Sequence, residues 1–138
     1  SINFENGISN GSFEAGIMAN RGCIIDATSA KVSENKKIGI IASNDSKIEF
    51  SNGIIENSGT DGIQSTHGSI VNARNSVIKN SGRYGMLAYG AQIYALESII
   101  DTTKSHGANS TTRLRRSGTG KRDRYCDFTT TSNYFCVA

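Results

Sequence analysis

Four glycines recur along this chain at a fixed interval of 23 residues, and this spacing constrains the fold more than any other feature. They are Gly16, Gly39, Gly62 and Gly85. Apolar residues keep the same interval at one, nine and eleven positions after each glycine. These columns contain Ile17, Ile40, Ile63 and Met86; Ile25, Ile48, Val71 and Tyr94; and Ala27, Phe50, Ala73 and Leu96. A repeat of this length indicates a solenoid, in which each coil covers the apolar face of the next one.

Each repeat contains three short segments in which apolar and polar residues alternate. In one unit they are Gly39–Ala42, Lys47–Phe50 and Gly53–Glu56, separated by residues typical of turns. Alternation with a period of two predicts β-strands with one buried face. Three strands per coil therefore predict an all-β fold, a right-handed parallel β-helix of about four and a half coils over residues 1–103.

The same columns predict which side chains form the core. We expect eight residues to point inward: Ile17, Ile25, Ile40, Ile48, Phe50, Ile63, Val71 and Tyr94. The columns extend back to Ile2 and Phe4, and no amphipathic helix precedes them. Because an open solenoid end exposes apolar side chains and unpaired strands, we expect the upstream part of a longer protein or another subunit to cover it.

Composition excludes several other architectures. The chain has 17 Ile but only 3 Leu, which argues against a leucine-rich repeat and against a helix bundle. No apolar run approaches the roughly 20 residues that a membrane-spanning helix needs, so no membrane span is expected.

The last 35 residues differ in charge from the rest. Residues 1–103 carry eight Lys or Arg and ten Asp or Glu, whereas residues 104–138 carry seven and two. We expect residues 104–138 to form a basic C-terminal cap or trimerisation element. Contact with anionic polysaccharide is an alternative. Nucleic acid is not expected as a partner, because no nucleic-acid fold motif accompanies the basic residues.

The cysteines do not predict a metal site. Cys126 and Cys136 bracket nine residues that we expect to form a hairpin, and whether they form a disulfide stays open. No paired His lies near them, so they lack the ligands of a zinc site. We expect neither a metal nor a cofactor.

The repeated phrase Gly-Ile-x-Ala-x-x-x-Ser-x-Ile-x-Phe, at residues 39–50, is followed by Ile-Ile-x-Asn-Ser-Gly at residues 54–59. This pattern resembles the right-handed β-helix of the pectate-lyase-like group, and the Asn/Ser/Gly-rich coils are most similar to those of bacteriophage tailspikes and tail fibres. The resemblance covers residues 1–103. It implies a homotrimer in the virion tail that binds polysaccharide at the surface of the host bacterium, and many such proteins also cleave it.

Two carboxylates are candidates for catalysis. Asp26 and Glu49 occupy the same outward position on adjacent coils, so their side chains are expected about 5 Å apart, a spacing that suits a retaining glycosidase. Carboxylates are also common on the solvated face of a strand, which requires no chemistry.

A second group of residues is a candidate for polysaccharide binding. Asp61, Arg83 and Tyr84 lie around two of the repeat glycines, while His67 and Tyr89 follow at the next turn. We expect these five residues to form one edge of the solenoid that offers rings and polar groups to a sugar. A histidine in a turn next to a glycine, such as His67 beside Gly68, is more often simply a turn residue exposed to solvent.

Asn57 and Asn80 occupy equivalent positions, each followed by Ser-Gly. They predict a hydrogen-bonded structural ladder, with Gly59 and Gly82 adopting positive φ at the turn.

Two functions follow from these observations. The first is the C-terminal module of a phage tailspike or tail fibre that binds host surface polysaccharide. The alternative is a fragment of a polysaccharide-degrading hydrolase or lyase whose site lies partly upstream of Ser1.

Overall fold

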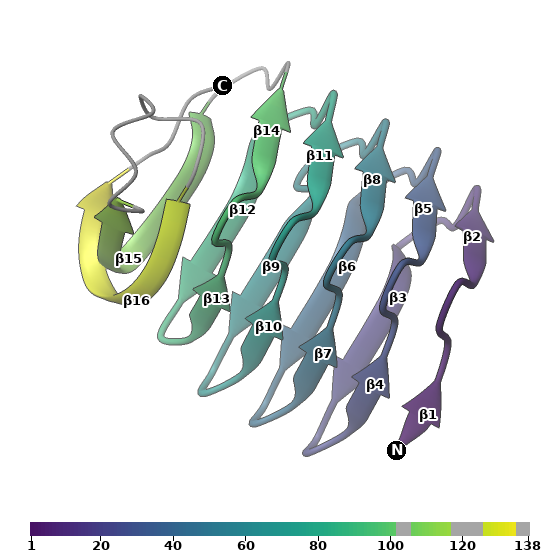
Figure 1. The fold of residues 1–138 in the computed structure, drawn as a ribbon, viewed down its shortest axis with the longest axis horizontal. Helices are drawn as coiled ribbons and strands as arrows, with labels where there is room; N and C mark the ends of the chain where they lie inside the picture. Colours follow the sequence, from purple (N-terminus) through teal and green to yellow (C-terminus); the bar gives the residue numbers. More distant parts are fainter. Residues whose placement is uncertain (102–105, 117–125, 135–138) are drawn as a thin grey trace.

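The computed structural model describes residues 1–101, 106–116 and 126–134. The described residues form strands and turns, and the strands wind as a right-handed parallel β-helix with coils of about 23 residues (Figure 1). The predicted fold class is therefore confirmed.

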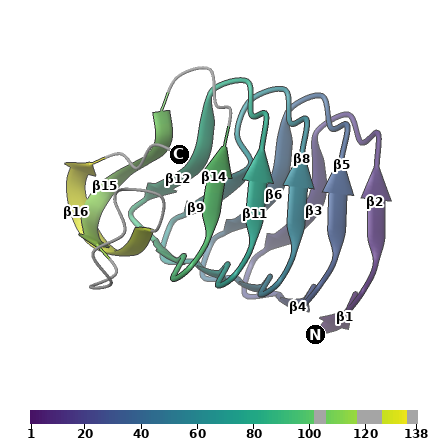
Figure 2. The same cartoon turned by 45° about the horizontal axis from the view of Figure 1, so that its top comes forward.

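The strands stack into three faces along the rod (Figure 2), and β16 (Cys126–Tyr134) joins two of them into one 11-stranded sheet. The long-strand sheet contains β3 (Ala15–Asn20), β6 (Ile38–Ser43), β9 (Ile63–Thr66), β12 (Tyr84–Tyr89) and β15 (His106–Arg116). The short-strand sheet contains β1 (Ile2–Asn3), β4 (Ile24–Asp26), β7 (Lys47–Glu49), β10 (Ile70–Asn72) and β13 (Gln92–Tyr94). The third sheet contains β2 (Ile8–Asn10), β5 (Lys31–Ser33), β8 (Ile54–Glu56), β11 (Val77–Lys79) and β14 (Ile99–Asp101).

The core is built from columns of aliphatic side chains in register along the rod. Ile17 pairs with Ile40, and Ile40 pairs with Ile63 in the next coil. Seven of the eight residues predicted to point inward are buried: Ile17, Ile25, Ile40, Ile48, Phe50, Ile63 and Val71. A column from the third sheet completes the core with Val32, Ile55, Ile78 and Ile100.

Tyr94 is the exception: the prediction that its side chain points into the core was wrong. Three residues separate β9 from β10, whereas two separate β12 from β13, so the last coil is one residue shorter. As a result Val71 pairs with Ile93, which is fully buried, and Asn72 pairs with Tyr94. Tyr94 therefore points outward and is only half-buried.

The periodic glycines are explained by close packing between coils. A Cβ atom on Gly62 would lie 2.6 Å from the carbonyl oxygen of Gly85, and it would also collide with a methyl group of Ile78. Real Cβ atoms do not approach so closely, so any side chain here would push the coils apart.

The predicted asparagine ladder is confirmed, but its glycines have another role. The Asn80 side chain donates a 2.7 Å hydrogen bond to Oδ1 of Asn57. Asn57 and Asn80 themselves adopt positive φ, of 58° and 55°, which asparagine tolerates better than most residues. Gly59 and Gly82 do not have positive φ; a Cβ atom on either would collide with the backbone of the preceding coil.

In the C-terminal part, one strand pairs with its neighbours in the antiparallel direction instead of the parallel one. Strand β15 still pairs in parallel with β12, but β16 (Cys126–Tyr134) runs antiparallel to both β15 and β13. Cys126–Tyr134 is thus a single strand, which corrects the expected hairpin between the last two cysteines. Cys136, residues 102–105 and residues 121–124, which contain three of the seven basic residues of the last 35, lie outside the described residues.

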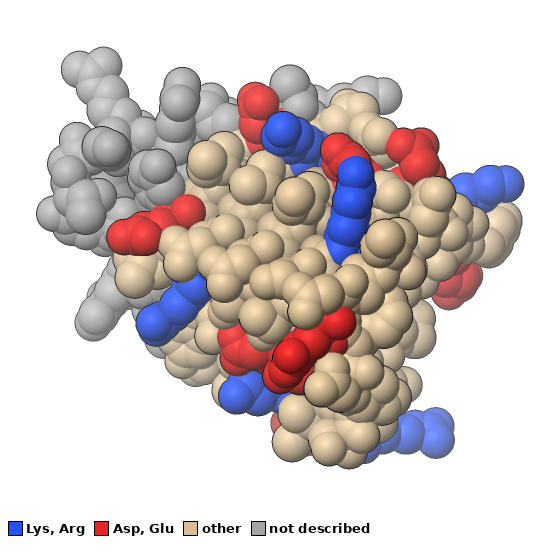
Figure 3. Space-filling model, turned by 45° about the vertical axis from the view of Figure 1, so that its right-hand side comes forward, with Lys and Arg blue, Asp and Glu red and all other residues tan. Residues whose placement is uncertain are grey.

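The end of the rod at β1, β2 and β3 exposes apolar side chains. Ile2, Ile8 and Phe13 are 57%, 74% and 65% exposed, and a cavity of about 290 Å³ lies between the first strands. Most of the surface on this side is uncharged, and the charged residues on it are of both signs (Figure 3). Within the described ranges, no helix is long and apolar enough to cross a membrane.

Candidate ligand-binding face

The outer surface of strands β9 and β12 and the residues beside it include four of the five predicted binding residues, all but the buried Asp61. Alternation along each strand sends Ile63, Ser65, Met86 and Ala88 into the core, so the residues between them face outward. We call this outer surface of β9 and β12, with Arg83 and His67 at its edges, the binding face.

Asp61 and Arg83 form an ion pair at the start of the binding face. The Asp61 side chain is completely buried, and its oxygens accept hydrogen bonds from Arg83 Nε at 2.9 Å and a second guanidinium nitrogen at 2.5 Å. It also accepts hydrogen bonds from Gln64 Nε2 at 2.5 Å and the backbone N–H of Tyr84 at 3.2 Å. Asp61 is therefore shielded from a ligand, and its role is to hold Arg83 and Gln64 in place.

Arg83 itself is accessible, with a side chain that is 49% exposed. Hydrogen bonding to Asp61 raises the pKa of its guanidinium above the ordinary value, so this side chain is always charged. The guanidinium lies 5.1 Å from the centre of the Tyr84 ring, within the range of a cation–π contact. The buried carboxylate and the ring together restrict Arg83 to one orientation, which favours recognition of a planar anion.

His67 and Tyr89 form a second cluster at the far end of β12. Their ring centres are 6.4 Å apart, with an angle of 63° between the ring planes. Tyr89 is 58% exposed, and His67 is also exposed in the turn after β9. Since Tyr84 and Tyr89 are five residues apart on one strand, the two clusters lie roughly 17 Å apart. Four of the five predicted residues thus lie at the two edges of one face, and not at one edge of the solenoid as expected, while Asp61 is buried beneath Arg83.

A row of less polar side chains lies between the two clusters, and sequence reasoning missed it. Met18, Ile41, Gln64 and Leu87 pair in that order across β3, β6, β9 and β12. Met18 is 52% exposed, and the other three are partly exposed. The sequence could have predicted this row, because each of the four residues occupies an outward position in its alternating segment. Apolar surface next to fixed polar groups is typical of ligand sites.

The catalytic candidates Asp26 and Glu49 are neighbours in register on the short-strand sheet. Each carboxylate, however, binds a hydroxyl two residues further on. Asp26 accepts hydrogen bonds from Thr28 Oγ1 at 2.8 Å and Thr28 N at 3.1 Å, while Glu49 accepts one from Ser51 Oγ at 2.6 Å. The bonds from Thr28 lower the pKa of Asp26 below its ordinary value. A lowered pKa fits a carboxylate that stays ionised, as a nucleophile or a turn residue does, and does not fit a general acid.

In the described part of the chain, no three His, Cys, Asp or Glu side chains come together as metal ligands. No family model matches the chain, and no curated protein is significantly similar to it.

Proposed function

We propose that this chain is a glycan-binding module, and that the binding face holds the polysaccharide. The observation that carries the proposal is the arrangement of Asp61, Arg83 and Tyr84, in which a buried carboxylate holds a half-exposed guanidinium over an aromatic ring. A restrained guanidinium pairs with a carboxylate or phosphate of the ligand at a low entropic cost. Surface polysaccharides often carry such groups.

The second cluster supports the same ligand class. A ring such as Tyr89, more than half exposed, offers an apolar face to the C–H groups of a sugar and a hydroxyl for hydrogen bonding. The two clusters are roughly 17 Å apart, which suits a chain of several sugars better than one small molecule.

The biological setting is also a proposal. The resemblance of the coils to those of phage tailspikes supports a tailspike or tail-fibre module that forms a homotrimer and acts at the bacterial cell surface. The parallel β-helix is consistent with this setting and with many others, since one fold hosts many functions.

The alternative is a fragment of a polysaccharide-degrading enzyme that uses Asp26 and Glu49. Their adjacent positions favour it, but the hydroxyl partners of both carboxylates support a structural role in the turns. Binding without cleavage is therefore the preferred function.

The test is to pass the protein over immobilised capsular and lipopolysaccharide glycans from a panel of bacteria. We expect retention without release of oligosaccharides. Tyr89→Ala and Arg83→Met should each weaken retention about tenfold, the loss of one stacking or charged contact. Tyr94→Ala and Arg74→Met are the matched controls, because these residues lie on other parts of the surface.

Two results would change the conclusion. Retention by no glycan of the panel, or retention insensitive to Tyr89 and Arg83, would overturn the binding face. Release of oligosaccharides that disappears in an Asp26→Asn/Glu49→Gln double variant would favour the enzyme instead.

A further inference from the structure

The outer surface of the third sheet is a different face of the rod from the binding face (Figure 2). In its three-residue strands the middle side chain points into the core, so the first and the third point outward. Because the strands are in register, these outward side chains form two columns along the rod. We call the surface that they form the third-sheet face.

The first column of the third-sheet face is mainly aliphatic. In the order of the coils it contains Ile8, Lys31, Ile54, Val77 and Ile99. Ile54 and Ile99 are 40% and 38% exposed, and Ile8 is the most exposed of all. Lys31 interrupts the column, but its ammonium reaches Glu56 Oε1 in the next coil at 2.7 Å, so only its methylene stem lies in the column. An exposed aliphatic stripe of this kind is typical of a protein–protein contact.

The second column of the third-sheet face alternates in charge. In the order of the coils it contains Asn10, Ser33, Glu56, Lys79 and Asp101. Lys79 is exposed, and none of the described carboxylates lies within ion-pair distance of its ammonium. Glu56 contacts Lys31 through one oxygen, which leaves the second oxygen for another partner. An ammonium and a carboxylate that can each take a partner thus lie on adjacent coils, about 4.8 Å apart.

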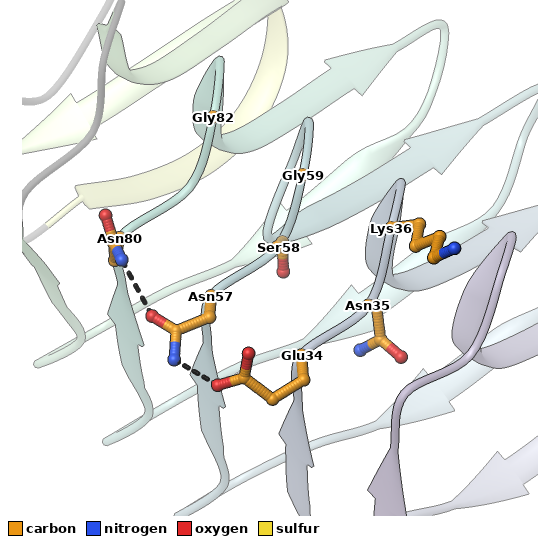
Figure 4. Close-up of a pocket in the computed structure, with 8 residues that line it drawn as sticks. All are labelled: Glu34, Asn35, Lys36, Asn57, Ser58, Gly59, Asn80 and Gly82. Carbon is orange, nitrogen blue, oxygen red and sulfur yellow. Dashed lines mark hydrogen bonds between the residues drawn. The ribbon is translucent and has the colours of Figure 1, made fainter.

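One edge of the third-sheet face is held by the ladder of Asn57 and Asn80, which Glu34 extends. These three residues directly follow β8, β11 and β5, and hydrogen bonds link their side chains (Figure 4). A groove of about 260 Å³ lies on the other side of the ladder. The ladder ties the ends of three neighbouring strands together, so the columns keep their spacing and little order has to be gained on association.

The two columns determine how the third-sheet face can pack against a copy of itself. Sheets that pack face to face commonly keep their strands nearly aligned, and a two-fold axis makes such a contact self-complementary. With the axis parallel to the strands, the two rods are antiparallel, and each column meets the same column of the copy. With the axis along the rod, the aliphatic column would meet the charged one and bury charges against apolar groups. The antiparallel arrangement is therefore favoured.

The charges then select one position for the axis. Between β8 and β11, the axis places Glu56 opposite the partner's Lys79 and, by symmetry, Lys79 opposite the partner's Glu56. It also places Ile54 opposite the partner's Val77. An axis through β8 or through β11 would place Glu56 or Lys79 opposite itself, and like charges repel. An axis between β5 and β8 would place Glu56 opposite the partner's Ser33, and one between β11 and β14 would overlap only two strands.

We propose that the third-sheet face is a self-association surface, on which two copies of this chain pair with antiparallel rods about a two-fold axis between β8 and β11. The overlap of β5, β8, β11 and β14 gives a contact of roughly 19 Å by 10 Å. This is well below the area of a stable dimer, so the pairing is weak and depends on concentration. The inference goes beyond the proposed function, because it needs no glycan and uses another face. Where the chain also forms trimers, pairing joins two of them and the mass still doubles.

The test is sedimentation equilibrium of the full chain from roughly 10 μM to 1 mM, the range of weak association. We expect the mass to double across this range, and less so at high salt, which screens the charge pairs. Lys79→Glu and Glu56→Lys each replace two attractive contacts by two repulsive ones, so each variant should associate about a hundredfold more weakly. Lys47→Glu, the same reversal at an exposed position of the short-strand sheet, is the matched control and should pair like the unmodified chain.

A mixture of the two variants gives the sharpest result. In a mixed pair every carboxylate of the two positions again faces an ammonium, so an equimolar mixture of Lys79→Glu and Glu56→Lys should recover the doubled mass that neither variant reaches alone. Circular dichroism checks the fold of each variant. Glu56→Lys removes the contact with Lys31 inside the chain, whereas Lys79→Glu removes no ion pair among the described residues and tests the proposal by itself.

Three results would overturn the pairing. They are a mass that is constant over the whole range, a doubled mass that Lys79→Glu leaves unchanged, and a mixture of folded variants that does not associate. None of these results bears on the proposed function, because the substitutions lie outside the binding face and retention on bacterial glycans is measured separately.

Discussion

A Cβ atom on Gly39 would lie 2.5 Å from the carbonyl oxygen of Gly62 in the next coil. The same atom would lie 2.6 Å from a methyl group of Ile55, which comes from the third sheet. The backbones of adjacent coils and a core side chain thus converge on one point, and only glycine fits there.

Gly39→Ala should therefore destabilise the protein by about 1–3 kcal/mol, the usual cost of overpacking a core. Urea unfolding followed by circular dichroism would measure this free energy. Ser43→Ala on the outer face of the same strand is the control, with an expected effect below about 0.5 kcal/mol. An unchanged midpoint in Gly39→Ala would show that the coils are not in close contact at this position.

The register of the last coil predicts that Ile93 matters more for stability than Tyr94. Ile93 is fully buried in the core, whereas Tyr94 is on the outer surface and its hydroxyl donates to Gln92. Ile93→Ala should cost about 2–5 kcal/mol, and Tyr94→Ala clearly less. The opposite order of the two unfolding free energies would mean that β13 is shifted by one residue.

The backbone conformation of Asn57 gives a prediction that separates two effects. Its φ of 58° is strained for most residues but not for glycine. Asn57→Gly should lose only the ladder hydrogen bonds. Asn57→Ala should lose them too, and its free energy of unfolding should fall by a further amount of about 1–2 kcal/mol because of the left-handed conformation. Thermal unfolding of both variants would measure the difference, and equal stability would contradict the left-handed turn.

The hydrogen bonds that Asp61 accepts from Arg83 predict that substitutions of the two residues affect stability in a coupled way. Asp61→Ala leaves the partners of the buried carboxylate without an acceptor, so it should destabilise the protein by about 2 kcal/mol. In a double-mutant cycle with Arg83→Ala, the two changes should not be additive, because they remove the same interaction. Additive free energies would show that Arg83 is not held by Asp61.

The lowered pKa of Asp26 predicts that the stability of the folded protein depends on pH. Its pKa is lowered in the folded protein, mainly by the Thr28 hydroxyl. The stability that it contributes is thus present above its unfolded pKa and is lost as the pH falls through the folded value. Thr28→Val should raise the pKa of Asp26 toward its ordinary value, and Thr28→Ser should not. A carbon-detected carboxyl titration would follow both variants, and an identical pKa in the two would exclude the hydroxyl as the cause.

The sequence by itself determined the fold class, the coil length and most of the core. The reason is that a solenoid repeats one local rule: the residue 23 positions away has the same environment, so columns such as Ile17, Ile40 and Ile63 reveal the stacking directly. The amide ladder of Asn57 and Asn80 was predictable on the same grounds.

Only the tertiary structure decided features that depend on exact length or on contacts between faces. The loss of one turn residue moved Ile93 into the core and Tyr94 out of it, and a fixed 23-residue frame cannot show such a shift. The burial of Asp61 behind Arg83 and the role of the periodic glycines depend on side chains and carbonyl groups from neighbouring coils. Such contacts are set by packing in three dimensions, because a sequence column records which residues are stacked but not how closely they approach.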